Sequence, residues 1–249
     1  MAKKKPRTPP PPRKVQAPQQ RQDPRQGMTT TQKRNLYFGI GAAALVAVAV
    51  VLVVVLASGG NSKAGNPNAV AASLKAAGCT LTTSPAAPYG EHIFDLKPTT
   101  VVTYSTYPPV SGRHYYQWAI WGNYTQPVDP RQAVHNEEHG GIDIWVGPDV
   151  SSSDRQKINN FYDSSPNAML VTPIENTHVG VIYPKHAPPG SKIYLTSWTV
   201  QIKNGNVANG KNVIAVCPRF DEKAFTAFRN EFRGKGPERF PVSTLTPGT

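Results

Sequence analysis

The hydrophobic pattern divides the chain into a polar start, one long apolar run and a mixed remainder. Residues 36–57 contain no charged side chain and are nearly all Val, Ala and Leu from Ala42 onward. A helix of that length, at about 1.5 Å per residue, matches the roughly 30 Å hydrocarbon core of a bilayer. Lys33 and Arg34 directly precede the run, and only Lys63 lies close after it. The positive-inside rule therefore predicts a single-pass helix in the cell membrane, with a cytoplasmic N-terminus and an extracytoplasmic remainder.

A cleaved signal peptide is the alternative interpretation of this apolar run. Val55-Leu56-Ala57 is compatible with a cleavage site. The run is longer than a typical signal-peptide core, which favours an uncleaved anchor.

Beyond the anchor, the apolar period alternates between that of helices and that of strands. Capping residues and apolar spacing predict helices over about 69–77, 130–139, 151–163 and 221–232. Short apolar or β-branched runs predict strands over 99–104, 142–146, 168–174, 179–183, 192–203 and 213–216. Residues 79–91, rich in Thr, Ser, Pro and Gly, are predicted to be a loop. This order is typical of an α+β domain, for which a split β-α-β layout is one arrangement.

These patterns predict five segments along the chain. They are a disordered, basic, Pro-rich cytoplasmic tail (1–35), the transmembrane helix (36–57), a Gly- and Ser-rich linker (58–68), one extracytoplasmic α+β domain (69–240) and a C-terminal tail (241–249).

The charge of the chain is concentrated at its N-terminus. Residues 1–35 hold ten of the 27 Lys and Arg residues but one of the 15 acidic residues, and the net charge of the whole chain is +12. The basic character therefore belongs to the predicted cytoplasmic tail, and the folded part gives no indication of nucleic-acid binding. The membrane is the partner that the sequence indicates.

The chain has two cysteines, Cys79 and Cys217, near the two ends of the predicted domain. Outside the cell, two such cysteines are expected to form one disulfide that closes a very long loop. Two unrelated buried thiols are the alternative. Neither Cys lies in a C-x-x-C pattern, which argues against thiol redox catalysis and a thiolate metal site.

Histidine and carboxylate side chains are concentrated in one part of the predicted domain. The densest run is His135-Asn136-Glu137-Glu138-His139-Gly140-Gly141, and His92 and His114 precede it. On a helix, the Cβ atoms of residues four positions apart lie about 5–6 Å from each other, so the two side chains can chelate one ion. On a strand, the two residues would stand about 13 Å apart, which is too far for one ion. Asp129, Pro130 and Gly140 are typical of the start and end of a short helix here.

These residues also resemble a known bacterial family. The elements of the resemblance are Gly90-x-His92, Tyr104-x-x-x-Pro108-Pro109-x-Ser111-Gly112-x-His114 and Val134-His135-Asn136-x-Glu138-His139-Gly140-Gly141. The pattern is similar to membrane-anchored or secreted proteins that share a domain of unknown function. The resemblance covers residues 92–145 closely and extends loosely to Pro237-Glu238. It implies an envelope location and no particular activity. Arg113 replaces a Pro found in many members, and Glu137 replaces a commonly apolar residue.

Three functions fit this pattern. The first is a transition-metal site, with copper or zinc bound by His92, His114, His135, Glu138 and His139 and no other cofactor implied. The second is a non-catalytic envelope protein whose His and Glu residues are structural or contact an envelope partner. The aromatic segment around Trp118 suits such a partner, or else a core. The third is a zinc metallohydrolase, because His135-x-x-Glu138-His139 has inverted-zincin spacing, although Gly140 and Gly141 would end the helix at once. The sequence favours metal binding over catalysis.

Overall fold

The computed structural model describes residues 67–249, and within this range no helix is long and apolar enough to cross a bilayer. The predicted cytoplasmic tail, transmembrane helix and nearly all of the predicted linker lie outside the described residues. The elements, in chain order, are α2 (Pro67–Ala76), β1 (Thr80–Pro85), β2 (His92–Ile93), β3 (Val102–Thr103), β4 (His114–Tyr115), α3 (Pro130–Glu138), β5 (Ile142–Val146), α4 (Ser152–Ser164), β6 (Met169–Pro173), β7 (Val181–Ile182), β8 (Ile193–Lys203), β9 (Asn206–Cys217), α5 (Glu222–Phe232) and a short 3₁₀ turn, η1 (Val242–Thr244).

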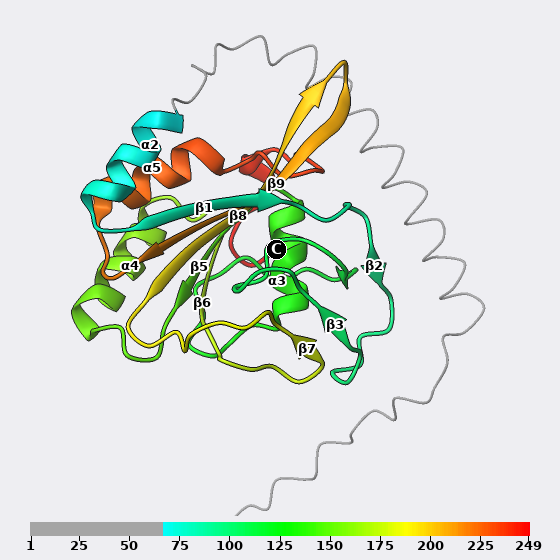
Figure 1. The fold of residues 1–249 in the computed structure, drawn as a ribbon, viewed down its shortest axis with the longest axis horizontal. Helices are drawn as coiled ribbons and strands as arrows, with labels where there is room; N and C mark the ends of the chain where they lie inside the picture. Colours follow the sequence, from blue (N-terminus) through cyan, green and yellow to red (C-terminus); the bar gives the residue numbers. More distant parts are fainter. Residues whose placement is uncertain (1–66) are drawn as a thin grey trace, which may run out of the picture. The chain divides into compact units, whose positions relative to one another are not determined.

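The described residues form a mixed α+β domain around one five-stranded sheet, as predicted (Figure 1). The strand order is β1-β9-β8-β5-β6, and all neighbours are antiparallel except β5 and β6. The connection from β5 to β6 passes through α4. Because β5 and β6 pair directly, this is a simple β-α-β unit, and the split arrangement considered from the sequence is wrong.

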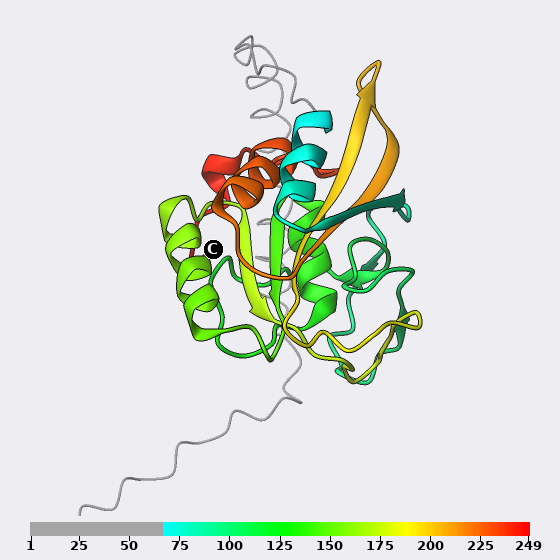
Figure 2. The same ribbon diagram turned by 60° about the vertical axis from the view of Figure 1, so that its left-hand side comes forward.

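The two faces of the sheet are covered differently. Helices α2, α4 and α5 pack on one face, where Phe225 and Phe228 of α5 are fully buried and belong to the core. Helix α3 and the segment 86–128 cover the other face, with Val134 and Trp198 at their contact. Figure 2 shows α3 and α4 on opposite sides of the sheet. Helix α3 is therefore held between the sheet and a long irregular segment.

One strand lies where the sequence predicts a loop. β1 occupies part of 79–91 and pairs along its length with β9, from Thr80 opposite Val216 to Pro85 opposite Lys211. The sequence of β1 is rich in Thr and Ser and shows little alternation of apolar and polar residues. This fits a strand at the edge of the sheet, where most side chains stay exposed. Pairing with a partner far along the chain, rather than local pattern, forms this strand.

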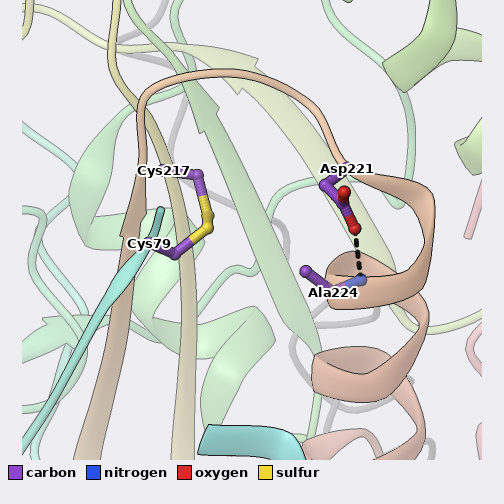
Figure 3. The surroundings of a disulfide bond; sticks show 4 residues. All are labelled: Cys79, Cys217, Asp221 and Ala224. Atoms are coloured by element: carbon purple, nitrogen blue, oxygen red, sulfur yellow. Dashed lines mark hydrogen bonds between the residues drawn. A yellow bond between two sulfur atoms is a disulfide. The ribbon is translucent and has the colours of Figure 1, made fainter. Parts of the chain in front are cut away.

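The predicted disulfide between Cys79 and Cys217 is confirmed, and it joins the start of β1 to the end of β9 (Figure 3). Shortly after it, the Asp221 side chain accepts a hydrogen bond from the amide of Ala224 and caps α5. The bridge therefore fixes the edge strand at the point where the sheet meets its covering helices.

The last residues also differ from the prediction of a tail. Leu245 is buried, and its carbonyl accepts a hydrogen bond from the amide of Ala168. The Thr249 carbonyl accepts one from the amide of Trp121. Residues 241–249 are therefore part of the folded domain, because they cover the apolar ring of Trp121, which is 1% exposed.

A buried arginine connects the start of α3 to the segment 86–128. Arg131 is 0% exposed, forms an ion pair with Asp129 (2.7 Å) and donates hydrogen bonds to the carbonyls of Pro98 and Thr100. Asp129 also caps α3 by accepting a hydrogen bond from the amide of Arg131. Burial alone would raise the pKa of Asp129, but hydrogen bonds from His178 and Arg131 and the Arg131 charge lower that pKa to about 2.

We predict that Asp129→Asn lowers the free energy of unfolding by about 3 kcal/mol at pH 7, because Arg131 is left buried without its counter-charge. The folded pKa is depressed, so the contribution of Asp129 is complete above its unfolded pKa of about 4 and is lost as pH falls through about 2. Urea unfolding of both proteins over this range measures the difference. The matched control is Asp95→Asn, whose ion pair with Lys97 is exposed. An equal loss in the two variants would contradict the prediction.

We also predict that the double variant Cys79→Ala plus Cys217→Ala lowers the free energy of unfolding by about 4–5 kcal/mol, as the chain-entropy model gives for a very long closed loop. Urea unfolding measures the loss. A reductant should bring the wild-type protein to the same stability and leave the variant unchanged. A wild-type protein that is insensitive to complete reduction would contradict this expectation.

Candidate metal centre

Helix α3 brings two of the predicted ligands together at its C-terminal end. Asp129 caps the helix, Pro130 is its first residue, and Gly140 follows it with φ +95°. The helical turn between His135 and His139 places their Nε2 atoms 2.9 Å apart. The predicted short helix is therefore confirmed, and it brings the two imidazoles side by side, as their spacing predicts.

Two short strands from the irregular segment supply the other two histidines. β2 and β4 pair in parallel with His92 opposite His114, and their rings lie 4.8 Å apart. The Nε2 atoms of both rings lie 3.0 Å from the same carboxylate oxygen, Oε2 of Glu138. The His92 ring also stacks on the ring of His135. Four of the five predicted ligands, His92, His114, His135 and Glu138, thus meet at one place, whereas the fifth, His139, lies beside His135 but outside this group.

Backbone carbonyls fix the orientation of two of the rings. Nδ1 of His114 lies 2.7 Å from the carbonyl oxygen of Gly112, and Nδ1 of His135 lies 2.7 Å from that of Tyr115. A carbonyl oxygen only accepts hydrogen bonds, so each Nδ1 carries the hydrogen. In a neutral ring, Nε2 then presents its lone pair to the centre of the cluster. Metal-binding histidines are typically held in this way by their second nitrogen.

Glu138 places a negative charge in the middle of the cluster. Its side chain is 0% exposed, and its other oxygen accepts a hydrogen bond from the amide of Gly90. Burial alone would raise the pKa of Glu138, but the hydrogen bond and charge of His114, the Gly90 amide and the charge of His92 lower that pKa to about 2. The carboxylate is therefore ionised at neutral pH, and it lies against the amide of Gly90 and the Nε2 atoms of His92 and His114.

Burial has the opposite consequence for His135. Its pKa is lowered to about 4, first by burial and then by the neighbouring rings of His139, His114 and His92, against the raising effect of the Tyr115 carbonyl. His135 is therefore neutral at pH 7 and has its lone pair available to a cation.

The ligand atoms form two overlapping groups that could hold a metal ion. The inner group is His92, His114, His135 and Glu138, and the outer group is His135, His139 and Glu238. Within each group the ligand atoms all lie within 4.8 Å of one another. Ligands about 2.0–2.1 Å from a tetrahedral zinc ion would be about 3.3 Å apart, close to the 3.0 Å contacts of Glu138 with the two histidines.

Glu238 is a further candidate ligand, and it is absent from the set predicted from the sequence. Its Oε2 lies 3.0 Å from Nε2 of His139, and its amide donates a hydrogen bond to the carbonyl of Glu138. The one available signal was the resemblance, which extended to Pro237-Glu238. No local pattern indicates that a carboxylate so far along the chain lies beside α3.

Glu137 is separated from the site although it lies beside Glu138 in sequence. Its side chain is buried against the sheet, where it accepts a hydrogen bond from the Thr196 hydroxyl. Burial and the nearby Asp143 carboxyl raise the pKa of Glu137. Glu137 is thus a core residue, in accordance with the apolar residue that the resemblance leads one to expect there.

The aromatic segment is divided between the core and the border of the site. Tyr115 and Trp121 are buried, whereas Trp118 is 41% exposed. The Trp118 ring lies 5.1 Å from that of His139 and 5.7 Å from that of His135. The two remaining histidines lie outside the cluster: His178 pairs with Asp129 and Glu175, and His186 stacks on Tyr107.

Comparisons with known proteins identify the family and no more specific relative. No curated protein and no solved structure matches the chain. One family model matches residues 96–239, more than half of the chain. The matched range includes His114, α3 and Glu238, whereas His92 precedes it. The chain therefore belongs to the family described as protein of unknown function (DUF3105).

Proposed function

We propose that this domain binds one transition-metal ion, copper or zinc, through Nε2 of His92, His114 and His135 and Oε2 of Glu138. The observation that carries the proposal is the convergence of these four atoms together with the Gly112 and Tyr115 carbonyls, which direct two of the lone pairs inward. Imidazole and carboxylate without thiolate suit Zn²⁺ and Cu²⁺ and disfavour Cu⁺ and iron–sulfur clusters.

Electrostatics supports a cation at this position. A neutral His114 ring has its Nε2 lone pair 3.0 Å from an ionised carboxylate oxygen, and two acceptors repel each other at that distance. Either a proton or a metal ion must lie between them. A divalent ion would satisfy the carboxylate and the three rings together, whereas a proton satisfies one contact at a time.

The donor set favours holding an ion over catalytic turnover. Four protein ligands complete a tetrahedral site, and catalytic zinc sites keep one position open for water or substrate. The general-base role that the H-x-x-E-H spacing would assign to Glu138 requires a carboxylate free to take a proton from water. Here both Glu138 oxygens have protein partners.

The cellular setting is part of the same proposal. The apolar run over 36–57 and its basic flank support a single-pass membrane protein with this domain outside the cytoplasm. The Cys79–Cys217 disulfide fits an oxidising compartment. We propose that the domain holds its ion at the outer surface of the membrane, where an envelope protein would be its partner.

We predict about one equivalent of copper or zinc in the full chain purified without a His tag, as one tetrahedral site requires. The double variant His114→Ala plus His135→Ala should contain none, and elemental analysis measures both. The matched control is His178→Ala plus His186→Ala, which removes two histidines outside the cluster and should retain the ion. Wild-type protein that takes up neither metal at neutral pH would exclude the proposal.

Glu138→Gln separates metal binding from a purely structural network, because it preserves shape and removes the charge. We predict that it weakens the affinity for the ion by about 100-fold or more, since the carboxylate is both ligand and counter-charge. Thermal unfolding with and without added Zn²⁺ measures this. Excess ion should stabilise the wild-type protein by about 2.7 kcal/mol at 100 times its Kd and the variant much less. If Glu138→Gln lowers the stability by the same amount with and without added Zn²⁺, the carboxylate has a structural role instead.

A further inference from the structure

The outer group of ligands is not used by the proposed site, apart from the shared His135. We infer that His139 and Glu238 form an entry site, at which a divalent transition-metal ion binds first and from which it moves inward to the ligands around Glu138. This inference rests on the proposed function, and it adds a second, transient metal site that faces solvent.

Exposure decreases along the series Glu238, His139 and Glu138. The Glu238 side chain is 31% exposed and that of His139 is 6% exposed, whereas Glu138 and His114 are 0% exposed. An ion that binds to Glu238 contacts a solvent-accessible carboxylate first. It then finds Nε2 of His139 at 3.0 Å from that carboxylate and Nε2 of His135 at 2.9 Å from His139. The donors thus form a continuous series from the surface to the buried site.

His135 belongs to both groups, and its chemistry determines how they work together. Its Nδ1 is occupied by the Tyr115 carbonyl, so Nε2 has one lone pair to offer. One lone pair binds one ion at a time. With the inner site filled, an outer ion keeps only His139 and Glu238 from the protein. The two groups are therefore successive positions for one ion, and the inner position is the stable one.

Glu238 is held in place by the backbone, which distinguishes this arrangement from a chance surface contact. Its amide bonds to the carbonyl of Glu138, and the amide of Gly234 bonds to the carbonyl of Gly140. A Cβ added to Gly236 would lie 2.3 Å from the backbone nitrogen of Gly140, so the two segments approach as only glycine permits. The C-terminal segment is thus packed directly on the end of α3.

Aromatic rings cover the sides of His139. Trp118 and Phe240 are 41% and 39% exposed, and their ring centroids lie 5.1 and 4.5 Å from that of His139. They hold the His139 ring while its Nε2 is directed to His135 and Glu238. His92, whose side chain is 24% exposed, is the competing route of access. The association rate of the ion distinguishes the two routes, because removing the ligands of the route in use slows association.

The experiment is stopped-flow binding of Cu²⁺ alone to the full chain, followed by quenching of tryptophan fluorescence. Cu²⁺ binds nitrogen and oxygen ligands more tightly than other divalent first-row ions, so it reports on the site whichever metal is native. For the double variant His139→Ala plus Glu238→Gln, we expect association of the ion to be about tenfold slower. The reason is that the variant lacks the carboxylate whose negative charge attracts the ion to the entry site. Dissociation should slow by the same factor, because the Kd of the inner site is unchanged.

The matched control is His178→Ala plus Glu175→Gln, which removes another surface histidine–carboxylate pair (3.1 Å) and the same charge. It should bind at the wild-type rate. If the double variant fails to fold, Glu238→Gln alone serves as the test, since it alters one partly exposed side chain, and slowing of about threefold or more supports entry here.

Three results would overturn the inference. Wild-type rates in the double variant would mean that ions enter past His92. A weaker Kd with faster dissociation would mean that His139 and Glu238 are permanent ligands of one enlarged site. Two ions bound at once would contradict successive use of His135. In each case the inner site stands, whereas wild-type protein that binds no Cu²⁺ would refute the proposed function itself.

Discussion

The buried carboxylate of Glu138 is the constraint on which the rest of the site depends. An ionised carboxyl removed from water is costly unless hydrogen bonds or cations surround it. Here the amide of Gly90 and the rings of His92 and His114 converge on it from a segment that is remote in sequence. The segment before α3 is thereby held against the end of the helix, so the geometry of the candidate metal centre depends on the packing of that segment.

The fold supplies rigid support on three sides of this carboxylate. Arg131 connects the first turn of α3 to Pro98 and Thr100, and the Asn136 side chain exchanges two hydrogen bonds with the backbone of Ala119. The C-terminal segment closes the third side through glycine contacts at Gly140. Short strands such as β2 and β4 would be weak alone. Helix α3 provides a common anchor for the irregular segments that carry the ligands.

The two adjacent glutamates show how position on a helix determines role. Glu137 and Glu138 differ by one residue, and therefore by about 100° around the helix axis. One carboxyl is buried against the sheet beside Thr196, where its raised pKa favours the neutral form. The other lies among histidines, where its lowered pKa maintains a charge. The same side chain thus serves the core in one case and the candidate metal centre in the other.

Local pattern by itself determined the parts of this protein that depend on near neighbours. Asp129, Pro130 and Gly140 delimit α3, so the proximity of the His135 and His139 rings follows from the sequence. The apolar spacing of the Phe residues likewise predicts the buried face of α5. All five residues of β5 are buried, Asp143 included, so the alternation in its sequence does not describe its burial. The expected membrane anchor rests on apolar length and flanking charge alone and lies outside the described residues.

Only the tertiary structure decided how distant parts of the chain are arranged, although the residue types had already predicted the disulfide and most of the cluster. Strand β1 has the composition of a loop and forms because β9 and the disulfide lie beside it. The pairing of His92 with His114 requires the bridge between β2 and β4, and Glu238 reaches His139 through backbone contacts with the end of α3. Such contacts join positions remote along the chain, and no periodicity within a short window records them. The sequence therefore predicted the helix, whereas it did not predict the complete set of ligands around it.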